Sequence, residues 1–100
     1  MSYTLRLYAF EDVSPQELQA AEQRFKAALE ATLGDAALVA PVYAAYMKIM
    51  ATHGETPPEE ALSPSELEIF KQWQAAELAA LTAALGTNRY MGDAQFEISS

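Results

Sequence analysis

The sequence has no cysteine, one histidine and only six basic residues among one hundred. Without cysteine the chain can form no disulfide, no thiolate metal site and no thiol nucleophile, and this composition favours a reducing compartment. The first residues lack the basic and apolar regions of a signal peptide. We therefore expect one small cytoplasmic domain that uses no cofactor.

The shortage of basic residues also excludes a class of function. Fourteen acidic residues give a formal net charge of -8 at pH 7. A surface that binds duplex nucleic acid needs clustered Lys and Arg, so we expect no nucleic-acid partner. The acidic balance does allow attraction to a basic protein. The basic residues are scattered along the chain, at Arg6, Arg24, Lys26, Lys48, Lys71 and Arg89.

No hydrophobic run is long enough to cross a membrane. The longest, Ala36–Ala51, is shorter than the roughly 20 residues that a spanning helix needs, and it contains Pro41 and Lys48. It is apolar nearly all round, which is typical of a central helix or of one covered by another subunit. Because proline fits poorly inside a helix, we expect the regular part to begin near Ala40, after a separate turn at Asp35–Val39.

The sequence Ser-Pro-x-Glu-Leu occurs twice, at Ser14–Leu18 and at Ser63–Leu67. A serine N-cap, a proline at the first helical position and a glutamate three residues after the serine are typical of helix N-termini. Each copy opens an apolar-periodic run that ends on Leu-Gly, and glycine suits a left-handed C-cap. The pattern predicts helices over about 15–33 and 64–85.

These two helices differ in their apolar faces. The first has one stripe, whereas the second has a main stripe and another well round the cylinder, which indicates contact with two partners. In the first helix, Glu22 and Lys26 have the spacing of an ion pair. The stripe of the first helix is Leu18, Ala21, Phe25, Leu29 and Thr32. In the second helix the main stripe is Leu67, Phe70, Leu78, Leu81 and Leu85, and the other stripe is Ile69, Trp73, Ala76, Ala80 and Ala84.

Strands are expected at both ends of the sequence. Polar and apolar residues alternate over Tyr3–Phe10 and again over Gln95–Ile98, which is typical of half-buried strands. Two strands alone are marginal, so we expect them to pair and to lie on the helices. The predicted fold is mainly α, a three-helix core with a small two-stranded sheet, in the order β-α-α-α-β. If successive helices run antiparallel, the last strand returns parallel to the first.

The sequence lacks the common catalytic and phosphate-binding motifs, which predicts that the protein is not an enzyme. His53 could act as a base beside Glu55 or bind a metal with Glu55, Glu59 and Glu60. Histidine at a helix C-terminus more often interacts with the helix dipole, and one histidine with carboxylates is a poor zinc site. We expect neither a catalytic residue nor a metal.

Two segments are candidates for recognition. The first is an aromatic and thioether surface formed by Tyr43, Tyr46, Met47 and Trp73, since such residues are enriched at interfaces; ordinary core packing is the alternative. The second is the irregular segment Thr52–Leu62, a candidate binding loop whose named residues are His53, Glu55, Glu59 and Glu60.

The sequence thus favours a small acidic protein-interaction module, a regulator, adaptor or inhibitor of an unidentified protein. Because the apolar surface exceeds what three helices readily cover, we also expect a homodimer. One alternative is a ligand-binding or enzymatic domain with a pocket near His53, Tyr43 and Arg89. A weaker one is an acidic mimic of nucleic acid.

Overall fold

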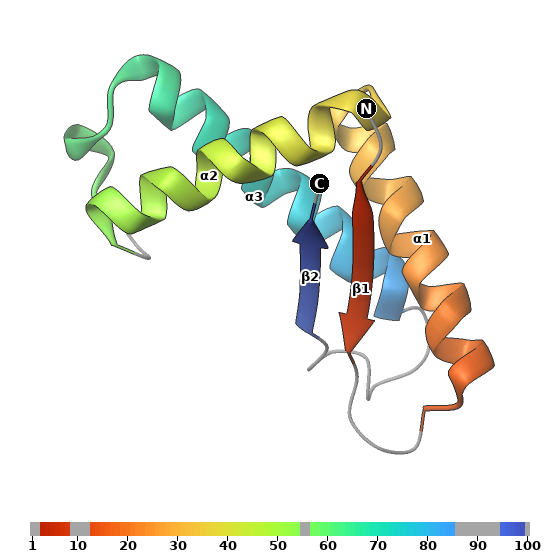
Figure 1. The fold of residues 1–100 in the computed structure, drawn as a ribbon. Coiled ribbons are helices and arrows are strands. Elements are labelled where there is room, and N and C mark those ends of the chain that lie inside the picture. The colour runs from red at the N-terminus through yellow and green to blue at the C-terminus, as the bar shows by residue number, and fades with distance from the viewer. Residues whose placement is uncertain (1–2, 9–12, 55–56, 86–94, 100) are drawn as a thin grey trace.

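The computed structural model describes residues 3–8, 13–54, 57–85 and 95–99 (Figure 1). It confirms the mainly α fold in the order β-α-α-α-β, with a two-stranded sheet formed by the N- and C-terminal segments. The elements are β1 (Thr4–Tyr8), α1 (Pro15–Leu33), the 3-10 turn η1 (Ala36–Leu38), α2 (Val39–His53), the 3-10 turn η2 (Glu59–Ala61), α3 (Pro64–Leu85) and β2 (Gln95–Ser99).

The repeated capping sequence starts α1 and α3 as predicted. Ser14 Oγ accepts the N–H of Glu17 at 3.1 Å. At the start of α3 the box is complete, because Ser63 Oγ accepts the N–H of Glu66 at 3.2 Å and the Glu66 carboxylate accepts the N–H of Ser63 at 3.0 Å. α1 ends at Gly34, whose φ of 95° is the left-handed conformation that glycine tolerates best.

The turn before α2 is also as predicted. Asp35 accepts the N–H of Ala37 and opens η1, and α2 then begins at Val39. Pro41 lies in the first turn, where a missing N–H costs no intrahelical hydrogen bond. α2 extends to His53, so the first two residues of the segment predicted as irregular are helical.

α1 packs on α3 through small side chains. Ala76, Ala80 and Ala84 are almost fully buried, as are Phe25 and Leu29 on α1. Alanine lets two helix axes approach closely, and the larger α1 side chains then fill the remaining space. The contact is also polar at one end, since the Arg24 guanidinium donates to the backbone oxygens of Ala83 and Ala84, both at 2.9 Å.

The main stripe predicted for α3 was wrong at Leu78, although Phe70 is 8% exposed and Leu67 and Leu81 pack against the core. Leu78 is 68% exposed, whereas Trp73 and the three alanines of the other stripe are fully buried or nearly so. Close approach to α1 decided which side faces inward, and that favours alanine over leucine. On α1, Thr32 is exposed and Leu33 takes the buried position.

The strands pair antiparallel, so the parallel arrangement was wrong. The register places Leu7 opposite Phe96 and Leu5 opposite Ile98. As Figure 1 shows, α2 does not return alongside α1 but leads away from it, and α3 brings the chain back to the sheet. In setting the direction of the last strand, α2 and α3 together therefore count as a single connection. The last strand therefore runs opposite to the first.

Two parts of the molecule follow from this path. The body consists of α1, the sheet and the C-terminal part of α3; the arm consists of α2, η2 and the N-terminal part of α3 (Figure 1). The extents are 42 × 27 × 19 Å and the radius of gyration is 14.1 Å, larger than the roughly 13 Å expected of a compact chain of this length. The molecule is therefore elongated and bent.

Because Leu78 is exposed and Leu29 is buried, truncating these two leucines should lower the free energy of unfolding by unequal amounts. Leu78→Ala should change the free energy of unfolding by no more than about 0.5 kcal/mol, because its side chain is already exposed. Leu29→Ala, the matched core truncation, should cost about 2–5 kcal/mol. Urea unfolding of both variants measures this, and equal costs would contradict the packing described here.

Candidate interaction surface

An aromatic cluster joins the arm to the body. The Tyr43 ring lies 4.9 Å from the Trp73 ring and 6.2 Å from the Phe96 ring, measured between centroids. Phe96 also packs on Phe25 of α1 at 5.0 Å, and Tyr46 packs on Phe70 at 5.3 Å. One contiguous set of rings therefore connects α2, α3, β2 and α1.

The four residues predicted as an interface differ in how far this cluster buries them. Trp73 is fully buried and Tyr46 is 8% exposed, so both belong to the core of this chain. Tyr43 is half-buried, and Met47, one turn further on the same flank of α2, is 44% exposed. Because Tyr43 contacts Phe96, that flank of α2 faces β2.

β2 has one edge that no described segment pairs with. The N–H of Leu7 donates to Glu22 at 2.9 Å, so it points away from β2. In an antiparallel ladder the residue opposite must then also point outward, which places the backbone groups of Phe96 and Ile98 on the far edge of β2. Among the described residues the sheet has two strands only.

The outer edge of β1, by contrast, lies beside α1, whose side chains contact part of it. Glu22 accepts the N–H of Leu7 instead of pairing with Lys26. The Lys26 ammonium lies 5.1 Å from the centre of the Tyr3 ring, and the Tyr3 hydroxyl donates to Glu30 at 2.9 Å. Partial burial of the Tyr3 side chain and its contact with Glu30 raise the pKa of Tyr3. One outward N–H of β1 is therefore satisfied by α1, while a hollow of about 290 Å³ lies beside Tyr3 and Leu5 at the same edge.

Two carboxylates, of Glu77 and Glu97, and one guanidinium, of Arg6, lie near the open β2 edge. Burial raises the pKa of Tyr43, and the charges of Glu77 and Glu97 raise it further, so both carboxylates act on the Tyr43 hydroxyl. Glu97 also accepts the Tyr8 hydroxyl at 3.2 Å on the outer face of the sheet. Arg6 lies opposite Glu97 in the register.

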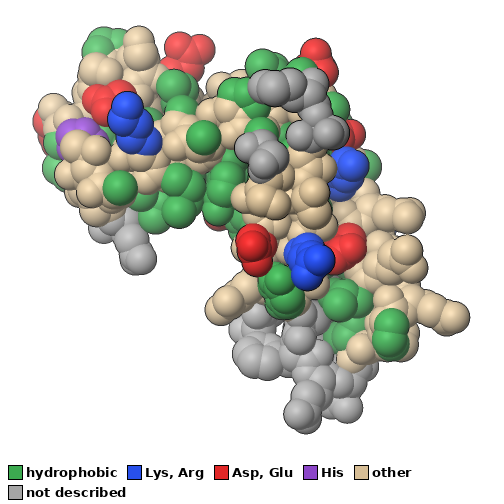
Figure 2. All heavy atoms as spheres, in the orientation of Figure 1, with side chains coloured by type: hydrophobic (Ala, Val, Ile, Leu, Met, Phe, Trp, Pro, Cys, Tyr) green, Lys and Arg blue, Asp and Glu red, His purple; other side chains and the backbone are tan. Residues whose placement is uncertain are grey.

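The open edge borders the angle between arm and body. Figure 1 shows β2 with β1 on one side and this angle on the other, beneath α2. Figure 2 shows a concave outline there, with hydrophobic side chains gathered on the side of the arm that borders it. The site therefore combines free backbone groups with an apolar wall. We call it the β2 edge site, and define it by Phe96, Glu97 and Ile98 with Tyr43 and Met47 of the arm.

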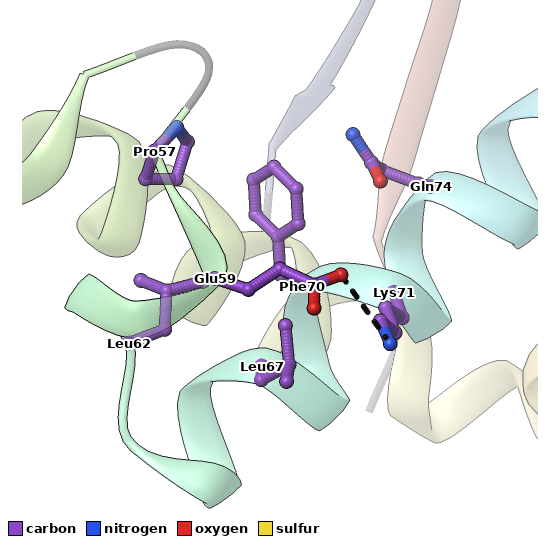
Figure 3. A pocket seen from close by; sticks show the side chains of 7 residues that line it. All are labelled: Pro57, Glu59, Leu62, Leu67, Phe70, Lys71 and Gln74. Carbon is purple, nitrogen blue, oxygen red and sulfur yellow. Dashed lines mark ion pairs between the residues drawn. The ribbon is translucent and has the colours of Figure 1, made fainter.

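A separate cavity of about 260 Å³ lies between the η2 segment and α3 (Figure 3). Leu62, Leu67 and Phe70 give it an apolar lining. At its rim Lys71 Nζ lies 3.6 Å from the Glu59 carboxylate, and both side chains are mostly exposed. Such an exposed pair contributes little to stability.

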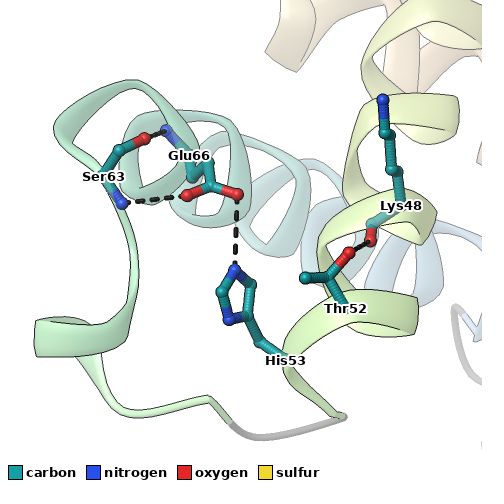
Figure 4. Close-up of polar contacts among 5 residues, drawn as sticks. All are labelled: Lys48, Thr52, His53, Ser63 and Glu66. Carbon is teal, nitrogen blue, oxygen red and sulfur yellow. Dashed lines mark hydrogen bonds and ion pairs between the residues drawn. The ribbon is translucent and has the colours of Figure 1, made fainter.

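His53 pairs with the capping box of α3. Its Nε2 atom lies 3.4 Å from Oε2 of Glu66, whose other oxygen accepts the N–H of Ser63 (Figure 4). The contact joins the C-terminus of α2 to the N-terminus of α3. The bond from Ser63, with a smaller contribution from His53, lowers the pKa of Glu66. The sequence had suggested Glu55, not Glu66, as the partner of His53.

The remaining predicted site residues are not brought together. Glu59 pairs with Lys71 and Glu60 is exposed, while Glu55 and Arg89 lie outside the described residues. Tyr43 and His53 are ten residues apart on α2, which at about 1.5 Å per residue is about 15 Å. They cannot line one small pocket from the same helix.

In the described part of the chain, no three His, Asp or Glu side chains are grouped to hold a metal ion. Within the same residues, no helix is long and apolar enough to cross a membrane.

Comparison of the chain with models of known families, with curated proteins and with solved structures found no match.

The Glu66 contact predicts a dependence of stability on acid pH. Its folded-state pKa is lowered, so the contact stabilises the fold above the unfolded-state value of about 4.3 and is lost as the pH falls through the lowered value. Glu66→Gln keeps a capping oxygen that does not titrate. Urea unfolding between about pH 6 and pH 3 should show the wild type losing stability relative to this variant. Glu68→Gln controls for net charge, and parallel profiles for wild type and Glu66→Gln would refute the prediction.

Proposed function

We propose that this protein is a small acidic protein-interaction module. The observation that supports it best is the open edge of β2, which lies beside an apolar wall in a concave part of the surface. Unpaired edges attract other chains, and proteins usually cover them. Within the described part of the chain, Glu22 of α1 satisfies one outward N–H of β1, and no segment pairs with the outward groups of β2. This asymmetry favours a recognition role for β2.

Ligand binding is the alternative class. The cavity beside η2 favours it, because its apolar lining and its charged rim resemble a small-molecule site in kind. Its volume of about 260 Å³ lies slightly below the usual range of roughly 300–1,000 Å³. The pocket expected near His53, Tyr43 and Arg89 has no such support, since the first two lie apart on α2.

A comparison of variants in pull-downs from the native host tests the interaction role. The baits are wild type, Met47→Lys at the β2 edge site, and Lys48→Gln as a control. Lys48 follows Met47 directly but lies on another flank of α2, beside Ile69 of α3. We expect a protein that the wild type and the control enrich and that Met47→Lys loses.

A triple variant, Glu55, Glu59 and Glu60 to Gln, tests the predicted binding loop in the same assay. Loss of the partner in this variant alone would move the site to the loop. If no bait enriches any protein, and native mass spectrometry of the wild type instead finds a retained small molecule, the interaction role is refuted and the ligand-binding class is favoured.

We also propose that the protein forms a homodimer. Leu38 and Leu78, both outside the β2 edge site, are 40% and 68% exposed, so two further helical elements present large apolar side chains. Such surface is often covered by a second subunit, most commonly with two-fold symmetry. Light scattering at micromolar concentration should give twice the chain mass. A mass near 10.9 kDa throughout a dilution series would contradict this.

A further inference from the structure

Resting on the interaction role above, we propose that the β2 edge site binds an extended segment of a basic partner protein, in which apolar residues alternate with Lys or Arg. The segment adds a third strand beside β2. Its backbone pairs with the edge, its apolar side chains face the arm, and its basic side chains lie next to Glu97. Three separate features of the site support these three statements.

The backbone of β2 supplies the pairing groups. Phe96 and Ile98 each direct one N–H and one C=O away from β1, as the register and the Leu7 hydrogen bond require. An extended segment can exchange hydrogen bonds with these groups without disturbing the existing ladder, because Gln95, Glu97 and Ser99 provide the bonds to β1. This is the usual geometry of strand addition to a sheet edge.

The inner side of the added strand calls for apolar residues. Phe96 and Ile98 are half-buried on the face of the sheet that packs on the helices. Beyond them lies the flank of α2 that carries Tyr43 and Met47, the latter 44% exposed. Every second side chain of an added strand would face this wall, because side chains alternate across a strand.

The outer side calls for basic residues. Glu97 is exposed there, and Arg6 of β1 lies opposite it in the register. Opposite charges on neighbouring strands stabilise a sheet and like charges directly opposite destabilise it. The net charge of -8 adds a general attraction for a basic partner.

A second copy of β2 fits this edge less well. If Phe96 of one copy pairs with Ile98 of the other, symmetry places Glu97 opposite its own equivalent. The apolar alternation would match, but the charges would repel. The homodimer proposed above would therefore use another surface, such as the exposed Leu78 side of α3.

Amide hydrogen exchange of the free protein, followed by NMR, is the first test. The N–H groups of Phe96 and Ile98 should exchange at least about tenfold faster than that of Glu97, which lies in the ladder. If both outward amides are protected at every dilution, the edge is not free and the proposal is overturned. Protection that appears only at high protein concentration would assign the edge to a second copy, which also overturns it.

Synthetic peptides then test the partner chemistry. The probe is Lys-Val-Lys-Val-Lys-Val-Lys. It is compared with its Glu-Val counterpart and with two backbone N-methylated versions, one methylated at the Lys residues and the other at the Val residues, which are called the two N-methylated phases. The basic probe should protect the amides of Phe96 and Ile98 and bind at least about tenfold more tightly than the acidic one, with a preference that falls as salt rises. At least one N-methylated phase should lose the binding, because it lacks the edge-directed donors.

The matched variants are Glu97→Gln at the site and Glu68→Gln on an exposed part of α3. The first should reduce the preference for the basic probe several-fold, and the second should leave it unchanged. Equal effects of the two variants would mean that the preference for the basic probe depends only on net charge, which would overturn the assignment to this edge. If no probe binds while Met47→Lys still abolishes capture of a host protein, strand addition fails and the interaction role stands.

Discussion

The burial of Trp73 is the constraint on which the arrangement of the elements depends. This side chain is fully enclosed where α2, α3 and β2 meet, and its indole N–H lies 3.4 Å from Glu77 one turn along the same helix. Tyr43 and Phe96 pack against it from the arm and from the sheet. α3 is the one helix that belongs to both parts, so its tryptophan fixes the bend between them. The concave surface beside β2 exists because of that bend.

The sheet illustrates how one residue type serves opposite purposes. Glu22 reaches from α1 to the edge of β1 and satisfies the outward N–H of Leu7. Glu97 lies on the outer face of β2, where its charge discourages pairing between identical strands but leaves the backbone edge free. An acidic residue at this position thus opposes self-association and, by the same charge, would favour a basic strand.

Much of the fold follows from local sequence signals, and the candidate site does not. The capping boxes at Ser14 and Ser63 determine helix starts through contacts within four residues, so the sequence predicted them correctly. The buried stripe of α3 depends on how closely α1 approaches, which hydrophobicity alone does not indicate. Which backbone groups of β2 point outward depends on the register with β1, a relation between the two ends of the chain. Glu22 was equally suited to Lys26 by spacing, and only the folded chain brings Leu7 to it.

The pairing of Thr4 with Ser99 has a mechanical consequence. Chain leading into β1 and chain leading out of β2 leave the sheet at the same end and on adjacent strands. Tension applied through both would act across the ladder at that end, so its hydrogen bonds would break one after another and would not share the load. The sheet would therefore open under a small pulling force, and Phe96 would be drawn away from Trp73 as it did so.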